Sequence, residues 1–248
     1  MAQHKSLRHM PFRVASLLEG LAVVAVADTL LLWQMRRVLG WHSQVVAKLL
    51  GVAGVPWETG REMNLLGGIS ATLVRTNYLD YAAHPYYPAL FTVAALAGYL
   101  LVYRRLPAPL KPLLGLAPAG LGITFLYLRV VWPTAPYTPE DFSAIWYRGE
   151  AYLWLLLPLV FALSFFILSV PFALKLGWLA GLMLYSFVWS ALRLAVALAT
   201  FFYFGWMWMP LFYFAFGFLA DFLYIVAFYS LAMNGAAAYL DQRREVWQ

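Results

Sequence analysis

Cysteine is absent from this chain, and charged residues are scarce. Without cysteine there are no disulfides, thiolate metal sites, iron–sulfur clusters or thiol nucleophiles. The 4 histidines leave little for zinc or haem, so we expect no metal and no cofactor. No spacing of residues matches a catalytic motif, which leaves open whether the chain is an enzyme. Charged side chains make up 11% of the 248 residues, against about 25% in soluble domains. An ordinary soluble domain is therefore excluded.

The remaining composition is strongly apolar, with 64% hydrophobic side chains. The charges gather in short stretches between apolar blocks, each long enough to cross about 30 Å of hydrocarbon at about 1.5 Å per residue. We therefore expect an all-α integral membrane protein, built as one polytopic domain of about six transmembrane helices. The predicted spans are residues 14–35, 89–103, 110–132, 151–173, 177–204 and 211–232.

Basic residues predict the orientation, because those beside short connections stay on the cytoplasmic side. Arg104 and Arg105 flank a tight connection after the second span, and Lys175 lies between the fourth and fifth. The first span is preceded by Lys5, Arg8 and Arg13. We therefore place both termini in the cytoplasm and the protein in the cytoplasmic (inner) membrane. Arg36 and Arg37 oppose this choice, but they introduce a long segment, where the charge rule is less reliable.

That long extracytoplasmic segment, residues 36–88, is predicted to contain an amphipathic helix lying on the membrane surface. The helix is indicated by apolar residues at helical spacing, with His42, Gln44 and Lys48 between them, and Pro56 ends it. Its apolar positions are Trp41, Val45, Val46, Leu49 and Leu50. Residues 133–149 form a second external segment.

A helix start is predicted within this second segment. Thr138 is expected to cap the helix, with Pro139 at its first position and Asp141 at its third. We expect a short interfacial helix there.

Charges inside the spans are the strongest functional signal, because they are costly in hydrocarbon. They are Asp28, Arg129, Arg193 and Asp221. Counted from the span ends, the depths of Asp28 and Arg193 agree to about 3 Å at about 1.5 Å per residue. We therefore predict that Arg193 pairs with Asp28, with Asp221 as the alternative partner.

Three interpretations of these charges stay open. They could form a structural ion pair that lets two helices meet without an unpaired charge in lipid. Alternatively, the outer layer has one more arginine than aspartate, and an arginine suits phosphate or carboxylate, so an outer-leaflet pocket could bind an anionic ligand. The third interpretation is proton coupling through Asp28 or Asp221.

Polar residues outside the spans provide candidates for catalysis. Glu58, Glu62, Asp80 and His84 could supply a general base above the membrane, where a lipid-linked substrate would arrive. The alternative is that these side chains are simply solvated on an external loop.

The tetrapeptide Ser190-Ala191-Leu192-Arg193 places an arginine within an apolar span. In this respect the last three spans, about residues 150–232, resemble the core of the exosortase and archaeosortase membrane transpeptidases. That family carries an extracytoplasmic cysteine, an arginine in the next span and a histidine or arginine in the last. Here no cysteine exists, and the last span has Asp221 but no histidine. The resemblance therefore implies a related scaffold without thiol catalysis.

The leading expectation is an inner-membrane protein that binds an anionic, lipid-like partner such as a polyprenyl phosphate, acting as an accessory or carrier. One alternative is a membrane-embedded, exosortase-like transferase acting on a lipid-linked or peptide substrate. Another is a structural subunit of a larger membrane complex. The expected partners are membrane lipids and other membrane subunits, and we expect no nucleic acid.

Overall fold

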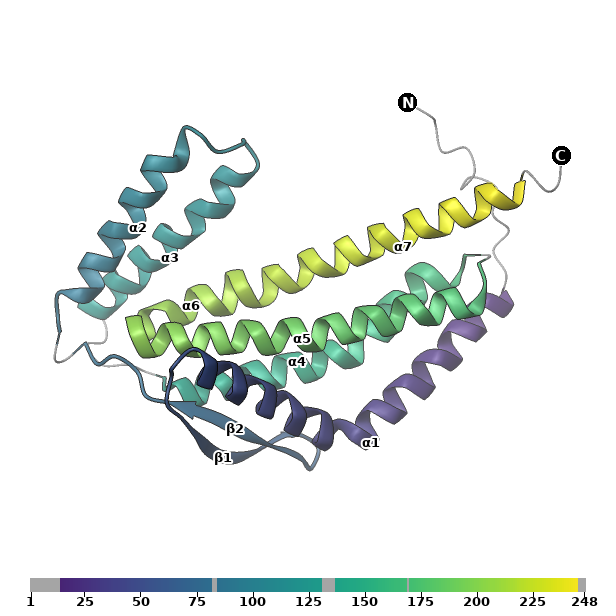
Figure 1. Ribbon diagram of the computed structural model, residues 1–248, viewed down its shortest axis with the longest axis horizontal. Coiled ribbons are helices and arrows are strands. Elements are labelled where there is room, and N and C mark those ends of the chain that lie inside the picture. The colour runs from purple at the N-terminus through teal and green to yellow at the C-terminus, as the bar shows by residue number, and fades with distance from the viewer. Residues whose placement is uncertain (1–13, 82–83, 131–136, 169, 245–248) are drawn as a thin grey trace. The chain divides into compact units, whose positions relative to one another are not determined.

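A computed structural model of the chain describes residues 14–81, 84–130, 137–168 and 170–244. Most of these residues are helical, as Figure 1 shows. The main helices are α1 (Val14–Val52), α2 (Tyr87–Tyr103), α3 (Leu110–Val130), α4 (Pro139–Phe161), α5 (Phe172–Phe204) and α7 (Ala220–Arg244). Shorter segments are the π-helices η2 (Ala162–Phe166) and η4 (Phe212–Leu219), the 3-10 helix η3 (Trp206–Trp208) and α6 (Met209–Leu211). Lys5, Arg8 and Arg13 lie outside the described residues.

Within the described residues, 5 helical segments are long and apolar enough to cross a membrane. They are Ala15–Val52, Leu110–Val130, Pro139–Phe166, Phe172–Phe204 and Trp206–Tyr239. Helix α2 is shorter, with 17 residues, and coincides with the predicted second span. The helices thus agree with the predicted membrane class, while the count of about six spans and the orientation of the termini stay predictions.

Two helices are longer than the sequence predicted. Helix α1 continues without a break to Val52, so the expected surface helix is the continuation of the first span. The part of α1 after residue 35 contains no proline, and its two glycines, Gly40 and Gly51, do not interrupt the helix. Helix α4 likewise joins the expected interfacial helix to the fourth span.

The predicted start of α4 is confirmed. The backbone N–H of Asp141 donates to Thr138 Oγ1 at 3.1 Å, and the backbone N–H of Thr138 donates to the Asp141 carboxylate at 3.1 Å. This reciprocal arrangement is a capping box with aspartate in place of glutamate.

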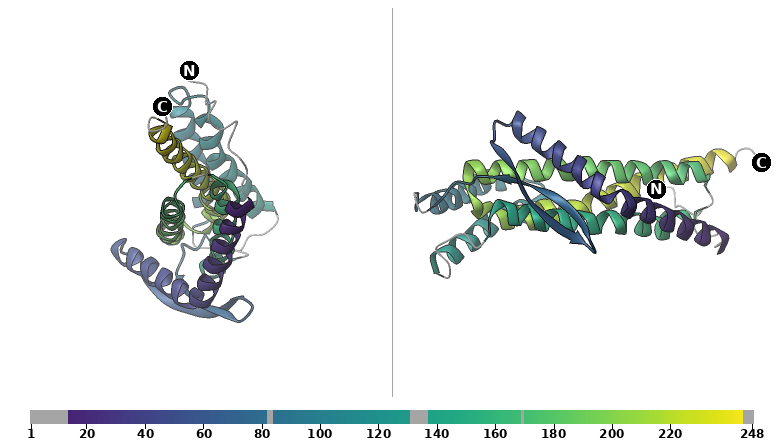
Figure 2. Two further views of the ribbon diagram at one scale, coloured as in Figure 1. Left: turned by 90° about the vertical axis from the view of Figure 1, so that its right-hand side faces the viewer. Right: turned by 90° about the horizontal axis from the view of Figure 1, so that it is seen from below.

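A β-hairpin is the one element outside the predicted helical architecture among the described residues. Strand β1 (Trp57–Leu66) pairs antiparallel with β2 (Ile69–Thr76), and the twisted ribbon is visible in Figure 2. The turn is Gly67-Gly68, with φ angles of 45° and 100° that favour glycine. A glycine pair between two extended segments is a known hairpin signal, and it was present in the sequence.

The chain divides into two compact units that share several helices. The "helical unit" consists of the described parts of residues 1–38, 149–189 and 222–248. The "hairpin unit" consists of the described parts of residues 39–148 and 190–221. The hairpin unit therefore contains the last third of α1, the β-hairpin, α2, α3, the first turns of α4, the end of α5, and η3, α6 and η4.

Aromatic and aliphatic side chains form the core of the helical unit. Phe165, Phe166, Leu157 and Leu182 are fully buried or nearly so. Gly20 lets α1 approach η2 closely, because a Cβ atom there would lie 3.1 Å from Cβ of Phe166. Between membrane-spanning helices, van der Waals contact among these large side chains, and the close approach that a small residue such as Gly20 permits, favours this packing.

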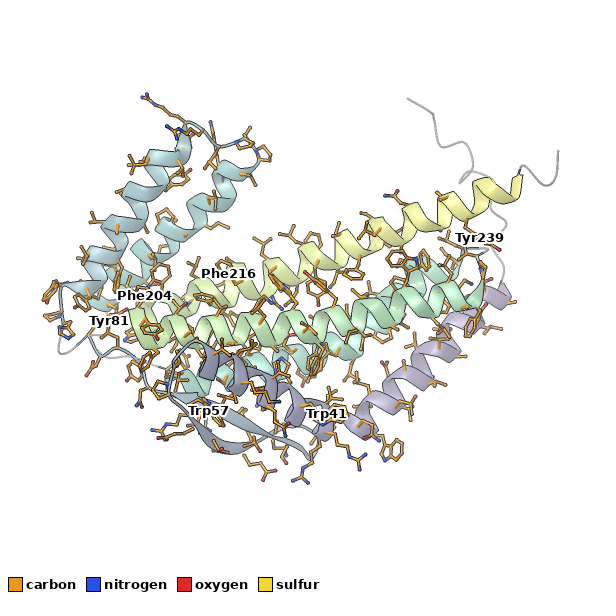
Figure 3. All side chains as sticks on the ribbon, viewed as in Figure 1. Trp41, Trp57, Tyr81, Phe204, Phe216 and Tyr239 are labelled. Atoms are coloured by element: carbon orange, nitrogen blue, oxygen red, sulfur yellow. The ribbon has the colours of Figure 1, made fainter. Side chains whose placement is uncertain are left out.

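The hairpin unit is fastened by hydrogen bonds at several places, and two of them involve α4 and the end of α5. The first turn of α4 holds the β-hairpin, because Arg61 donates to Asp141 at 2.8 Å and Ser143 donates to the Val74 carbonyl at 3.1 Å. At the second place, the Tyr81 hydroxyl donates to the Phe204 carbonyl at 2.5 Å, and both residues are labelled in Figure 3. Burial raises the pKa of the Tyr81 phenol, so it stays protonated and able to donate.

Gly205 is required beside Tyr81. Its φ is 82°, and a Cβ atom there would lie 2.4 Å from the Tyr81 hydroxyl oxygen. Any larger residue would therefore be strained in its backbone and would also displace the tyrosine.

Candidate functional site

Arg193 is buried in the hairpin unit and pairs with Asp221. Its Nη2 donates to the Asp221 carboxylate, while Nη1 donates to the carbonyls of Phe216 and Gly217, the latter at 2.9 Å. Both carbonyls belong to the π-helix η4. The acid in contact with Arg193 is thus the alternative that the sequence left open, and this pairing corrects the expected pair with Asp28.

The reason for this correction lies in η4. Depth was counted with the rise of a regular α-helix, but 8 residues just before Asp221 form a π-helix instead. A π-helix has more residues in each turn, so it changes both the height and the direction of the side chains that follow.

A serine and a histidine lie beside this ion pair. Ser190 is one turn before Arg193 on α5, and its Oγ accepts a hydrogen bond from Trp146 Nε1 at 3.1 Å. The same oxygen lies 3.2 Å from His42 Nε2. The Trp146 ring also faces the guanidinium, with Arg193 Cζ 5.1 Å from the ring centre.

This geometry determines which group can accept the hydroxyl hydrogen of Ser190. Because its oxygen accepts the Trp146 N–H, its own hydrogen is available for His42 Nε2 when the imidazole carries its proton on Nδ1. A hydroxyl that donates to an imidazole is the arrangement of a nucleophile and its base. Both side chains are 0% exposed, so the contact can equally serve to pair two polar groups inside the core.

His42 is a residue whose position the sequence analysis missed. It was placed on the polar face of a surface helix, yet it is buried in line with Leu39, Val46 and Leu50. These residues repeat every three or four positions, so a buried stripe that includes His42 was present in the sequence. The Tyr147 ring packs edge-on against His42 with centroids 5.2 Å apart, and its hydroxyl lies 3.0 Å from Ser43 Oγ.

Ser43 also lines a cavity of about 440 Å³ between the second half of α1 and the β-hairpin. We call this cavity the hairpin groove. Its polar lining residues are Ser43, Gln44 and Lys48 of α1 and Glu58, Thr59 and Thr72 of the hairpin. Trp57, labelled in Figure 3, lines it as well.

The groove contains two charges of opposite sign. Lys48 and Glu58 are both exposed, and neither makes an ion pair within 4.0 Å of any residue that the structure describes. Arg193, by contrast, is neutralised by Asp221. Within the groove lining, Lys48 is therefore the cation whose charge is available to a ligand.

Two other predicted ligand-binding residues lie apart from this groove lining. Asp28, on the part of α1 in the helical unit, is half-buried, and its Oδ1 is enclosed without a hydrogen bond to any described residue. Arg129, near the end of α3, is exposed and lies over the Phe125 ring at 5.8 Å. It makes no ion pair among the described residues.

The four surface candidates for catalysis have separate environments. Glu58 lines the hairpin groove, whereas Glu62 accepts a hydrogen bond from Ser70 at 2.5 Å. His84 stacks on Tyr87 with ring centres 4.7 Å apart, and Asp80 is exposed. Among the described residues, no group of three or more His, Asp or Glu is placed to hold a metal ion.

The helical unit contains a further buried cation, Lys175. Its Nζ donates to the carbonyl of Phe166, the last residue of η2, at 2.8 Å and lies 3.6 Å from Glu19 Oε2. Lysine near a helix end satisfies carbonyls that have no partner in the helix, and here an acid from α1 balances its charge.

Comparison of the chain with protein-family models, curated proteins and solved structures gave no match. The resemblance to the exosortase and archaeosortase core therefore stays a prediction, based on Arg193 in an apolar span. Any functional conclusion depends on the geometry described above.

Proposed function

We propose that this chain is an integral membrane protein that binds an anionic, lipid-like headgroup in the hairpin groove, as an accessory or carrier. The observation that carries the proposal is Lys48, which lines the groove without an acidic partner among the described residues. Its ammonium has three donors, and the hydroxyl and amide groups around it can complete the hydrogen bonds of a phosphate.

The surroundings of the groove suit the level of lipid headgroups. Trp57 lines the groove and is 44% exposed, and Trp41 on α1 is 60% exposed. Tryptophan side chains are enriched where a membrane meets water, because the indole is apolar but carries one donor. The volume of the groove also lies within the range of about 300–1,000 Å³ that is usual for small-molecule sites.

This proposal moves the anion site away from the intramembrane arginines. Arg193 already donates to one carboxylate and two carbonyls, so a phosphate would have to compete with all three acceptors. Arg129 is exposed and is therefore the alternative position for an anion site, which an experiment must distinguish from Lys48.

The test is ligand-induced stabilisation of the detergent-solubilised full chain. A ligand that binds only the folded state stabilises it by mass action, by about 2.7 kcal/mol at a hundred times the Kd, and so raises its melting temperature. We expect phosphatidylglycerol and polyprenyl phosphate to stabilise the wild type more than a diacylglycerol does. Lys48→Gln should lose most of this stabilisation, while Arg105→Gln, which removes one exposed charge elsewhere, should keep it. Equal stabilisation of wild type and Lys48→Gln would contradict the proposal.

A second candidate function, group transfer through Ser190, is favoured by the 3.2 Å approach of His42 Nε2 to Ser190 Oγ. In this hypothesis His42 accepts the hydroxyl proton as Ser190 Oγ attacks the substrate carbonyl. The same proton passes to the leaving group when its bond to the carbonyl carbon breaks, and the acyl-serine that remains is transferred to an acceptor. The burial of both residues requires that the substrate open a path to them.

A fluorophosphonate probe tests this second candidate, because it reacts with activated serines. Labelling should be lost in Ser190→Ala and His42→Gln and kept in Ser186→Ala, another buried serine on α5 that accepts a tryptophan hydrogen bond. A wild-type protein that the probe does not label would reject the transferase hypothesis.

A further inference from the structure

We infer that the hairpin groove selects a zwitterionic headgroup that carries both a phosphate and a primary ammonium, the chemistry of phosphoethanolamine. This inference rests on the proposed function and adds a second contact to it. Lys48 on α1 receives the phosphate, and Glu58 at the start of β1 receives the ammonium.

The two charges lie on opposite walls of one cavity. Lys48 belongs to the helical wall and Glu58 to the hairpin wall, and neither is neutralised by a described residue within 4.0 Å. Arg75 is the strand partner of Glu58 in the hairpin register, but no ion pair joins them.

A purely anionic ligand would satisfy Lys48 and be repelled by Glu58. A ligand with both charges can pair with Lys48 and Glu58 at once. Glu58 therefore disfavours purely anionic ligands and favours zwitterionic ones.

Trp57 supplies a second feature that suits an ammonium. Its partly exposed ring lines the same groove. The face of an indole attracts cations, and a carboxylate elsewhere in the groove lining adds hydrogen bonds when the cation has N–H groups. A primary ammonium has three such groups, whereas a quaternary choline has none. We therefore expect ethanolamine to be preferred over choline.

Binding of short-chain lipids to the full chain in detergent micelles tests this selectivity. The probes are dihexanoyl phosphatidylethanolamine, phosphatidylcholine and phosphatidylglycerol, measured by isothermal titration calorimetry. The wild type should bind the ethanolamine lipid most tightly. Glu58→Gln should weaken binding of the ethanolamine lipid about tenfold, because it removes one charge-assisted contact. Its affinity for the glycerol lipid should be unchanged or higher. Glu62→Gln, the same change on the same strand outside the groove, should behave like the wild type.

The outcomes separate this inference from the proposed function. If Glu58→Gln leaves the ratio of ethanolamine to glycerol affinity unchanged, the zwitterion inference fails, although dependence on Lys48 would still support the groove. If Lys48→Gln binds all the probes as the wild type does, both fail together. Free phosphoethanolamine shows whether the headgroup comes from a lipid or from a soluble molecule. Binding as tight as that of the lipid indicates a soluble ligand, and much weaker binding indicates a membrane lipid. A melting curve of each variant confirms that it is folded.

Discussion

The two units contain the same hydrogen-bonded pair of side chains, with different third partners. In the helical unit, Trp154 on α4 donates to Ser186 on α5 at 3.1 Å, and the Ser186 hydroxyl lies 2.8 Å from that of Tyr224. In the hairpin unit, Trp146 donates to Ser190 at 3.1 Å, and the third group is the imidazole of His42. Because the tryptophan–serine bond recurs, we assign it to fastening α4 to α5. What distinguishes the hairpin unit is the histidine.

The buried cations repeat this comparison. Lys175 and Arg193 each donate to a carbonyl of a π-helix, and each has one acid as a partner. The environments differ in solvent access, because the side chain of Glu19 is 34% exposed and that of Asp221 is 16% exposed. The same arrangement should therefore contribute more to stability in the hairpin unit, where less water can replace a lost partner.

The largest effect is expected from Arg193→Leu. Removing one member of a buried ion pair leaves the other charge uncompensated, so the free energy of unfolding should fall by about 3–5 kcal/mol. Adding Asp221→Leu should recover much of this loss, which a thermal melt in detergent would show. A double variant as unstable as the sum of the two single changes would contradict the pairing.

Lys175→Met should show a smaller loss, of about 1–2 kcal/mol, because water can still solvate Glu19 once its partner is gone. The same melting experiment, run beside Arg193→Leu, measures the difference between the two units. If Lys175→Met lowers the free energy of unfolding as much as Arg193→Leu does, solvent access to the partner acid does not explain the difference between the two units.

Ser186→Ala and Ser190→Ala should cost similar stability, about 1–3 kcal/mol, because each leaves a buried tryptophan N–H without its acceptor. They should differ in the imidazole signals of ¹⁵N-histidine NMR spectra, which are simple because the chain has 4 histidines. The His42 signal should shift in Ser190→Ala and stay in place in Ser186→Ala. A His42 signal that moves in both variants would break the distinction between the two serines.

The smallest effect on the fold is expected from single introduced cysteines. Their labelling is unambiguous because the native chain has no cysteine. Thr59→Cys in the hairpin groove should react with an impermeant thiol reagent in intact cells. Ala108→Cys, in the short connection beside Arg104 and Arg105, should be protected because basic residues retain such connections in the cytoplasm. The reverse pattern would invert the predicted topology and place the groove on the cytoplasmic side.

The helices were predictable because their signals are local. Apolar length located the membrane-sized segments, and Thr138 with Asp141 marked the start of α4. The hairpin was not predicted, although Gly67-Gly68 is a turn signal, because the charged residues of β1 were interpreted as part of an external loop. The sequence did not predict that α1 is continuous. The apolar pattern becomes amphipathic after residue 35, and this change was interpreted as the end of the first span.

The site was less predictable because it depends on contacts between distant segments. A charge in an apolar helix requires compensation, so the burial of Arg193 and its need for an acid followed from the sequence. Its choice of Asp221 did not, because the π-helix η4 has no sequence signature that we could read. The hairpin groove likewise arises where β1 and β2 approach α1, and no local pattern contains that approach.

Photo-crosslinking tests the central claim, ligand binding in the hairpin groove, most directly. A phosphatidylethanolamine with a photoreactive headgroup is irradiated with the full chain, and the attached peptides are identified by mass spectrometry. The account predicts attachment within residues 40–48, 57–59 and 72–74, and its loss in Lys48→Gln. Attachment that persists in that variant, or that centres on Arg129 or Asp28 instead, would contradict it.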